Sequence, residues 1–194
     1  MSARAKQGFT LIELMAVVAV LGLLIAILVP SLGRVRKQSK RTACMSNLRQ
    51  IGTAIQAYRN QNRDHYPVAR SMPEPFVTAA VNDPPLFDAL QDEIPKTSRV
   101  YACPGDSGYV HARCGISYLY NTNLSGRQPE DVFLHRELKV PIHEIPAAYD
   151  FDGATVEIPG ASLTIPFFHL RRNLLFADGH VGEFHVDPTS RPSL

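Results

Sequence analysis

The sequence predicts an α+β protein in which one long N-terminal helix is followed by a head built on a small antiparallel sheet. Three observations support this. An apolar, helix-length run extends from Phe9 to Val29. A pattern of helical period continues it to about residue 60. The remaining chain carries most of the 15 prolines and 8 of the 12 glycines, which is typical of short elements and loops rather than of a helical bundle.

The first predicted element is a membrane-spanning helix over residues 9–29. At about 1.5 Å per residue it is roughly 31 Å long, enough to cross the hydrocarbon core of a bilayer. Glu13 is the only charged residue in this run. A carboxylate near the start of such a segment costs about 1–3 kcal/mol, so it needs a partner or a purpose. No small-residue cleavage site of a secretory signal peptide follows the run, so we expect the segment to be retained.

The second predicted element continues the same helix over residues 30–60. Small and apolar residues recur in it at three- to five-residue spacing and predict one buried stripe. Pro30 has no amide hydrogen, which predicts a kink or local melting. The basic residues between Arg34 and Arg41 lie mainly off the stripe, as on a solvated helix face or one lying against lipid phosphates. The stripe consists of Leu32, Val35, Ser39, Ala43, Leu48, Ile51, Ile55 and Tyr58.

The head, residues 61–194, opens with a polar stretch that ends the helix. A short helix is predicted at 85–90. Asp178 and Gly179 predict a two-residue turn that returns the chain through 180–186, so a C-terminal hairpin is the clearest feature of the head. Aromatic and β-branched residues predict strands at 100–104, 116–121, 163–168 and 173–177.

The charge balance and the missing catalytic motifs limit the function. The chain has 20 Lys and Arg against 18 Asp and Glu, and loss of a leader with Arg4 and Lys6 would leave 18 of each. This balance argues against a nucleic-acid binder that works through bulk charge. The sequence contains no G-x-S-x-G, H-E-x-x-H, phosphate-loop or dinucleotide signature. We therefore expect no enzyme activity.

The start of the chain carries a resemblance to a known family. Gly8 ends a short basic leader, Phe9 follows it, and Glu13 is the fifth residue after the glycine. This joined pattern resembles the processing site of type IV pilins and of the pseudopilins of type II secretion. The resemblance implies that residues 1–8 are a leader, that a prepilin peptidase cuts after Gly8 and methylates Phe9, and that Glu13 serves in assembly.

The same resemblance implies a function and partners. The subunit would be held in the bacterial inner membrane by a single span, with its head extracytoplasmic. It would polymerise with other pilin-like subunits into a secretion pseudopilus or a pilus-like filament. A cytoplasmic ATPase and an inner-membrane assembly platform are the other implied partners. The alternative is a membrane-tethered extracytoplasmic binding module that forms no filament.

Two questions stay open at this point. The basic residues that follow the apolar run would, by a positive-inside count, place the head in the cytoplasm, in conflict with the orientation that the resemblance implies. The N-terminal pattern is also shared by secretion pseudopili, pili and DNA-uptake filaments, so it does not choose among them.

The cysteines carry part of a second resemblance, to pseudopilin-like proteins named for a histidine nine residues before an Asp-Gly pair. Cys44, Cys103 and the Asp178-Gly179 pair match that pattern, whereas His169 departs from it because eight residues separate it from Asp178. An extracytoplasmic head favours a disulfide. Cys103 with Cys114 would close a small loop, and Cys44 with Cys103 would join helix to sheet. We predict the second pairing, which uses the two cysteines of the resemblance.

Metal binding is the last open point. Major pseudopilins bind structural calcium in loops of their C-terminal sheet, so the resemblance makes Asp150, Asp152 and Asp178 candidate calcium ligands. Aspartate before glycine is first of all turn chemistry, and residues 150–153 are too short for an EF-hand loop. The cysteines and histidines match no known zinc spacing. We therefore expect no cofactor and keep structural calcium as the alternative.

Overall fold

The computed structural model describes residues 11–76, 82–158, 161–169 and 171–185. The chain forms two compact units, one ending at Ser39 and the other beginning at Lys40. The helix α1 (Leu11–Gln61) is 51 residues long, so the second unit contains the last part of α1 together with the head. Strands follow the helix, and the predicted α+β class is confirmed.

The head is built from short elements. Its strands are β1 (Tyr118–Tyr120), β2 (Pro146–Asp150), β3 (Thr155–Ile158), β4 (Ala161–Thr164), β5 (Arg171–Phe176) and β6 (Val181–His185). Its helical turns are α2 (Leu86–Ala89), η1 (Arg99–Tyr101), α3 (His111–Cys114), η2 (Pro129–Asp131), α4 (Phe133–Arg136) and η3 (Ile142–Glu144). The predicted short helix at 85–90 corresponds to α2.

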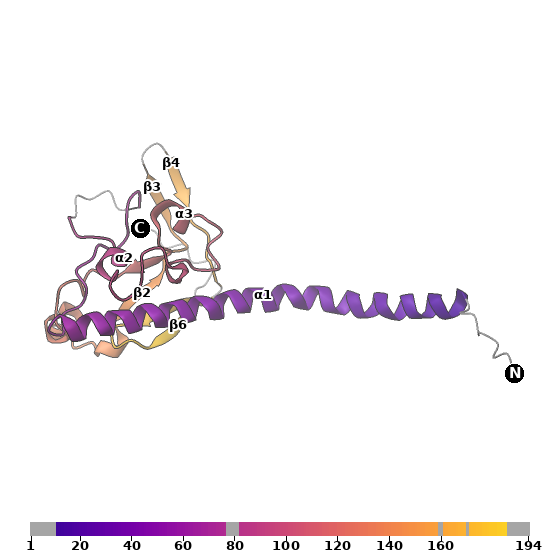
Figure 1. Ribbon diagram of the computed structural model, residues 1–194, viewed down its shortest axis with the longest axis horizontal. Coiled ribbons are helices and arrows are strands. Elements are labelled where there is room, and N and C mark those ends of the chain that lie inside the picture. The colour runs from indigo at the N-terminus through magenta and orange to yellow at the C-terminus, as the bar shows by residue number, and fades with distance from the viewer. Residues whose placement is uncertain (1–10, 77–81, 159–160, 170, 186–194) are drawn as a thin grey trace, which may run out of the picture. The chain divides into compact units, whose positions relative to one another are not determined.

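Four strands form one antiparallel sheet in the order β1-β2-β5-β6. The strands β3 and β4 pair separately, as an antiparallel ribbon that is visible in Figure 1. The strands β2 and β5 are neighbours in the middle of the sheet. Residues at the end of β2 and just before β5 are therefore buried within the head. Asp150 ends β2, and His169 stands two residues before β5.

The C-terminal hairpin of β5 and β6 lies against α1 (Figure 1). The hairpin itself is confirmed, with Leu175 opposite Val181. Beyond the paired strands, the amide of Phe176 donates to the carbonyl of His180 at 2.9 Å and closes a loop of three residues, 177–179, rather than the predicted two. Within this loop the amide of Gly179 donates to the carbonyl of Phe176, also at 2.9 Å. Gly179 has a φ of +96°, and this left-handed residue is what a three-residue loop with a bulge requires.

The buried face of α1 in the head runs through Cys44, Leu48, Ile51 and Ile55, each at most 2% exposed. Their spacing of four, three and four residues follows one side of a helix. The predicted stripe is therefore confirmed from Leu48 onward. It is wrong at Ala43, which is exposed, because the helical face that meets the sheet passes through Cys44 instead.

Nearer the N-terminus the stripe prediction also fails. Leu32 is 46% exposed and Val35 is 61% exposed. Both residues lie in the first compact unit. A helical spacing of apolar residues predicts an apolar face, but it does not show that another part of the chain covers that face. The helix continues through Pro30 without interruption, so local melting does not occur there. A proline inside a helix costs about 3 kcal/mol, and the helical turns formed on both sides carry the helix through this position.

Two predicted strands are corrected by the structure. Residues 100–104 do not form a strand; they begin inside η1, where the Ser98 hydroxyl accepts a hydrogen bond from the amide of Val100 at 3.3 Å. This cap favours a helical turn over an extended chain. The strand predicted at 163–168 ends at Thr164, because Pro166 follows and cannot donate to a ladder.

Gly52 lies where α1 packs against the hairpin. A Cβ at this position would lie 2.7 Å from Cδ1 of Leu175 and 3.2 Å from the carbonyl oxygen of Gly179. We expect Gly52→Ala to lower the stability of the head by about 1–3 kcal/mol through overpacking. Thermal unfolding of the full chain in detergent measures this loss.

The matched control for that substitution is Gly33→Ala. A Cβ at Gly33 would meet nothing within 4 Å, so alanine there should leave the melting temperature unchanged or raise it slightly through its better helix propensity. Equal melting temperatures for the two variants would contradict the close packing of α1 on the hairpin.

Candidate functional site

The N-terminal part of α1 presents an apolar surface that the described chain does not cover. Every large apolar side chain from Leu11 to Val29 is between 49% and 76% exposed. The helix is long and apolar enough to cross a membrane. Burying one such side chain is worth roughly 1.5–3 kcal/mol. So large an exposed apolar surface requires lipid, or the same surface of other helices, as its surroundings.

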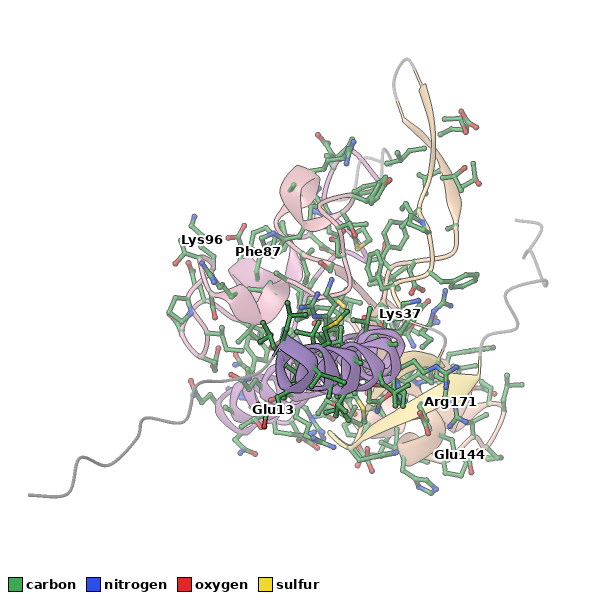
Figure 2. The ribbon with its side chains drawn as sticks, turned by 90° about the vertical axis from the view of Figure 1, so that its right-hand side faces the viewer. Glu13, Lys37, Phe87, Lys96, Glu144 and Arg171 are labelled. Atoms are coloured by element: carbon green, nitrogen blue, oxygen red, sulfur yellow. The ribbon has the colours of Figure 1, made fainter. Side chains whose placement is uncertain are left out.

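Glu13 lies in the first turn of α1 and points away from the helix axis (Figure 2). A carboxylate in the first turn of a helix is favoured by the helix dipole. Gly8 and Phe9, the predicted processing residues, lie outside the described residues.

The basic segment that follows is exposed, except at its end. Residues 34–40 are exposed. Arg41 forms an ion pair with Glu183 of β6 and retains 14% exposure. Arg171 of β5 also pairs with Glu183, at 3.0 Å. The last basic residue of the segment therefore helps to hold α1 to the hairpin within the head.

A cluster of four chemically reactive side chains lies where α1 meets the sheet. The cluster consists of Cys44, Cys103, Asp150 and His169, and their ligand-type atoms all lie within 4.8 Å of one another. Each is at most 7% exposed. Cys44 comes from α1, Cys103 from the loop after η1, Asp150 from the end of β2, and His169 from the segment before β5. The fold thus brings together residues that are far apart in sequence.

The contacts inside the cluster are short. Sγ of Cys44 lies 2.8 Å from Sγ of Cys103 and 3.0 Å from Oδ1 of Asp150. Sγ of Cys103 lies 3.2 Å from Nε2 of His169. Both cysteines are free thiols in this structure, so the disulfide predicted between them stays a prediction.

Neighbouring groups hold the cluster in place. The backbone amide and the side-chain amide of Asn173 donate to Oδ2 of Asp150 at 3.2 and 3.3 Å. The hydroxyl of Ser117 accepts from the amide of Cys103 at 3.1 Å and donates to Asp106 at 2.9 Å. The amide of Gly105 donates to Sγ of Cys103 at 3.4 Å. These hydrogen bonds orient Asp150 and Cys103 within the cluster.

Burial controls the ionisation of the cluster. It raises the pKa of Asp150 to about 6, a shift that the hydrogen bond from Cys44 partly opposes. Burial also lowers the pKa of His169 to about 4, helped by the positive charges of Arg41 and Lys40. Burial and the neighbouring thiol and carboxylate raise the pKa of Cys44. At neutral pH the imidazole of His169 is therefore neutral, the form that binds metals.

Cys114 is not part of this cluster. It lies at the end of α3, where its thiol donates to the carbonyls of Val110 at 3.3 Å and of Ile116 at 3.2 Å. Burial raises its pKa to about 11. Its surroundings are those of an inert, structural thiol.

The three predicted calcium candidates have different partners. Asp150 belongs to the cluster. Asp152 is bound by Arg172, whose guanidinium lies 2.7 Å from Oδ1. Asp178 accepts a hydrogen bond from the amide of His180 at 3.1 Å and contacts the ring of the same residue. Burial alone would raise the pKa of Asp178, but the bonds from His180 outweigh it and the pKa is lowered. Among the described residues the three do not form one ligand set, and calcium binding stays a prediction.

Sequence reasoning did not find the cluster as a unit. It named all four residues, but paired the cysteines with each other, assigned Asp150 to calcium and left His169 without a role. The only available signal was that Cys44, Cys103 and the region of His169 take part in the second resemblance. Their separations of 59, 47 and 19 residues match no local metal-binding motif.

Comparisons with known proteins agree with the N-terminal pattern. The family model described as the prokaryotic N-terminal methylation motif matches residues 3–29. The type IV major pilin protein PilA of Myxococcus xanthus is 40% identical over 61 residues, which cover 31% of this chain and 27% of that pilin.

Two further relatives carry the same printed name. The type II secretion system core protein G of Pseudomonas aeruginosa is 39% identical over 62 residues, which cover 32% of this chain and 44% of that protein. The type II secretion system core protein G of Escherichia coli is 30% identical over 125 residues, which cover 64% of this chain and 84% of that protein. The chain thus spans less than half of the first two relatives and most of the third. A search of solved structures finds no match.

Proposed function

Because this chain belongs to the pseudopilin family that includes type II secretion system core protein G, we propose that it is a structural subunit of a pilin-like filament. The observation that carries the proposal is the apolar surface of residues 11–29, which no described part of the chain covers. A subunit stored in a membrane and then packed against copies of itself gives that surface suitable surroundings in both states.

The chemistry of assembly follows from the N-terminus. A prepilin peptidase removes residues 1–8 and methylates the new amino group of Phe9. In the filament Glu13 of one subunit meets the amino terminus of a neighbour. Both charges are then surrounded by apolar helices, where an unpaired carboxylate is costly. This pairing fixes the axial register between subunits.

The remaining assignments follow from the same proposal. The chain spans the inner membrane once, with its head extracytoplasmic. A cytoplasmic ATPase and a membrane platform drive polymerisation. The head catalyses no reaction, and its sheet supplies the outer surface of the filament.

The intact mass and N-terminal peptide of the chain from its native membrane test this proposal. We expect a chain that begins at N-methylated Phe9. The control is the same chain from cells without prepilin peptidase, which should begin at residue 1. A chain that begins at Met1 in cells with active peptidase would overturn the proposal and favour a plain membrane-tethered module.

A further inference from the structure

Filament assembly does not explain why four reactive side chains, Cys44, Cys103, Asp150 and His169, are buried together in the head. We propose that these four side chains bind one zinc ion that fastens α1 to the sheet of the head. Their ligand atoms lie within 4.8 Å of one another, and all four side chains are buried. Each comes from a different element, so an ion bound to them would join four parts of the fold.

The distances suit a tetrahedral ion. Zinc holds sulfur at about 2.3 Å and nitrogen or oxygen at about 2.0–2.2 Å, which places neighbouring ligand atoms roughly 3.3–3.8 Å apart. The three short contacts here measure 2.8, 3.0 and 3.2 Å. These three contacts would lengthen by less than about 1 Å, and the longest separations, which reach at most 4.8 Å, would shorten by up to about 1 Å to enclose an ion.

The donor set selects the metal. Two thiols and an imidazole are soft or borderline ligands, which favour zinc over calcium or magnesium. Four protein ligands complete a tetrahedron and leave no position for substrate, as in structural rather than catalytic zinc sites. The ion thus stabilises the head without giving it an enzymatic activity.

The buried carboxylate favours an ion over a disulfide. Asp150 is 0% exposed, and within the described residues no ion pair reaches it. A buried carboxylate is normally paired with a cation or coordinated to a metal. A disulfide between Cys44 and Cys103 would remove the thiol hydrogen that Asp150 accepts and would leave the carboxylate without a cation beside it. Zinc binding releases the two thiol protons to solvent, and the ion then coordinates the carboxylate directly, together with the two thiolates and the imidazole.

The surroundings of the cluster support the same assignment. Asn173 donates twice to Oδ2 of Asp150, which leaves Oδ1 facing Cys44. Hydrogen bonds of this kind orient metal ligands from behind. A Cβ at Gly105 would lie 2.7 Å from Cε1 of His169, so only glycine leaves the imidazole in its present position. A surface depression lined by Asn47, Ala102, Cys103 and Pro104 borders the cluster at Cys103.

The first test uses the full chain, purified in detergent without chelators and incubated with zinc chloride under reducing conditions before dialysis. We expect about one zinc per chain by elemental analysis. A parallel sample, taken from membranes without reductant and denatured in excess N-ethylmaleimide, should carry three adducts. A single adduct would show a native disulfide, and a reduced chain that retains no zinc would show no site; either result overturns the proposal.

The second test uses matched variants and cobalt as a spectroscopic probe. His169→Ala should weaken zinc binding by more than the roughly 10–100-fold that loss of an outer-shell partner causes. His169→Cys should keep the metal and, with cobalt, gain sulfur-to-cobalt charge-transfer absorption. Cys114→Ser and His180→Ala, which lie outside the cluster, should bind as the parent chain does. The cobalt spectrum of the unmodified chain needs no variant to fold, and absence of thiolate-cobalt bands in it would overturn the proposal.

Discussion

Replacing Glu13 by alanine is expected to abolish filament assembly while leaving the head folded. The expectation follows from the energy of one buried charge pair. Two unit charges about 4 Å apart interact by about 4 kcal/mol at an effective dielectric constant of 20. Loss of that pairing at each contact between subunits would lower the association constant by roughly 100- to 1,000-fold.

Filaments sheared from cells and counted by sedimentation and electron microscopy measure this effect. Thermal unfolding of the purified variant in detergent reports separately on the head, which contains none of residues 11–39. Met15→Leu is the matched control, because it keeps both volume and apolar character in the same exposed run. Wild-type filament yield from the Glu13→Ala chain would contradict the charge-pair mechanism and favour a tethered module that never polymerises.

The sequence correctly predicts those parts of the fold that depend on residues close together in the chain. The long helix follows from one uninterrupted apolar and amphipathic period, and the hairpin from Asp178 and Gly179. The strand β2 was missed because Pro146 and two alanines open it, and these residues give no β-propensity signal. Only its place between β1 and β5 makes this segment a strand.

The cluster could not be predicted, for a different reason. Its four residues meet because α1 packs on a sheet whose middle strands are β2 and β5. Local spacing carries no information about such a meeting, since Cys44 and Asp150 are 106 residues apart. The burial of Asp150 is likewise decided by packing, and an Asp-x-Asp-Gly sequence reads as an exposed turn.

Arg172 provides the other large effect that we expect. Its guanidinium donates to Oδ1 of Asp152 at 2.9 Å and to the backbone carbonyl of the same residue at 2.6 Å. The side chain of Asp152 is 0% exposed and that of Arg172 is 24% exposed. The guanidinium also lies 5.8 Å from the ring centres of both Tyr149 and Phe167. Burial raises the pKa of Asp152, and Arg172 opposes that shift.

We expect Arg172→Ala to destabilise the head by about 3 kcal/mol, because it leaves a buried carboxylate without its cation. The melting temperature of the full chain should fall by roughly 6–12 °C. Asp152→Asn in the same chain should recover part of that loss, since it removes the uncompensated charge. Differential scanning calorimetry in detergent measures all three chains.

The neighbouring residue, Arg171, provides the control, because its ion pair is exposed whereas that of Arg172 is buried. Arg171, which Figure 2 labels, points to the opposite face of β5 from Arg172. It is 55% exposed and pairs with Glu183, which is 40% exposed. Exposed pairs of this kind contribute about 0.2–1 kcal/mol, so Arg171→Ala should change the melting temperature by only a few degrees. Equal losses for the two variants would mean that charge removal alone, rather than burial of Asp152, sets the cost. The two neighbours thus differ in the burial of their partners: Arg172 compensates the charge of the buried Asp152, whereas Arg171, at the exposed start of β5, pairs with Glu183, which remains 40% exposed.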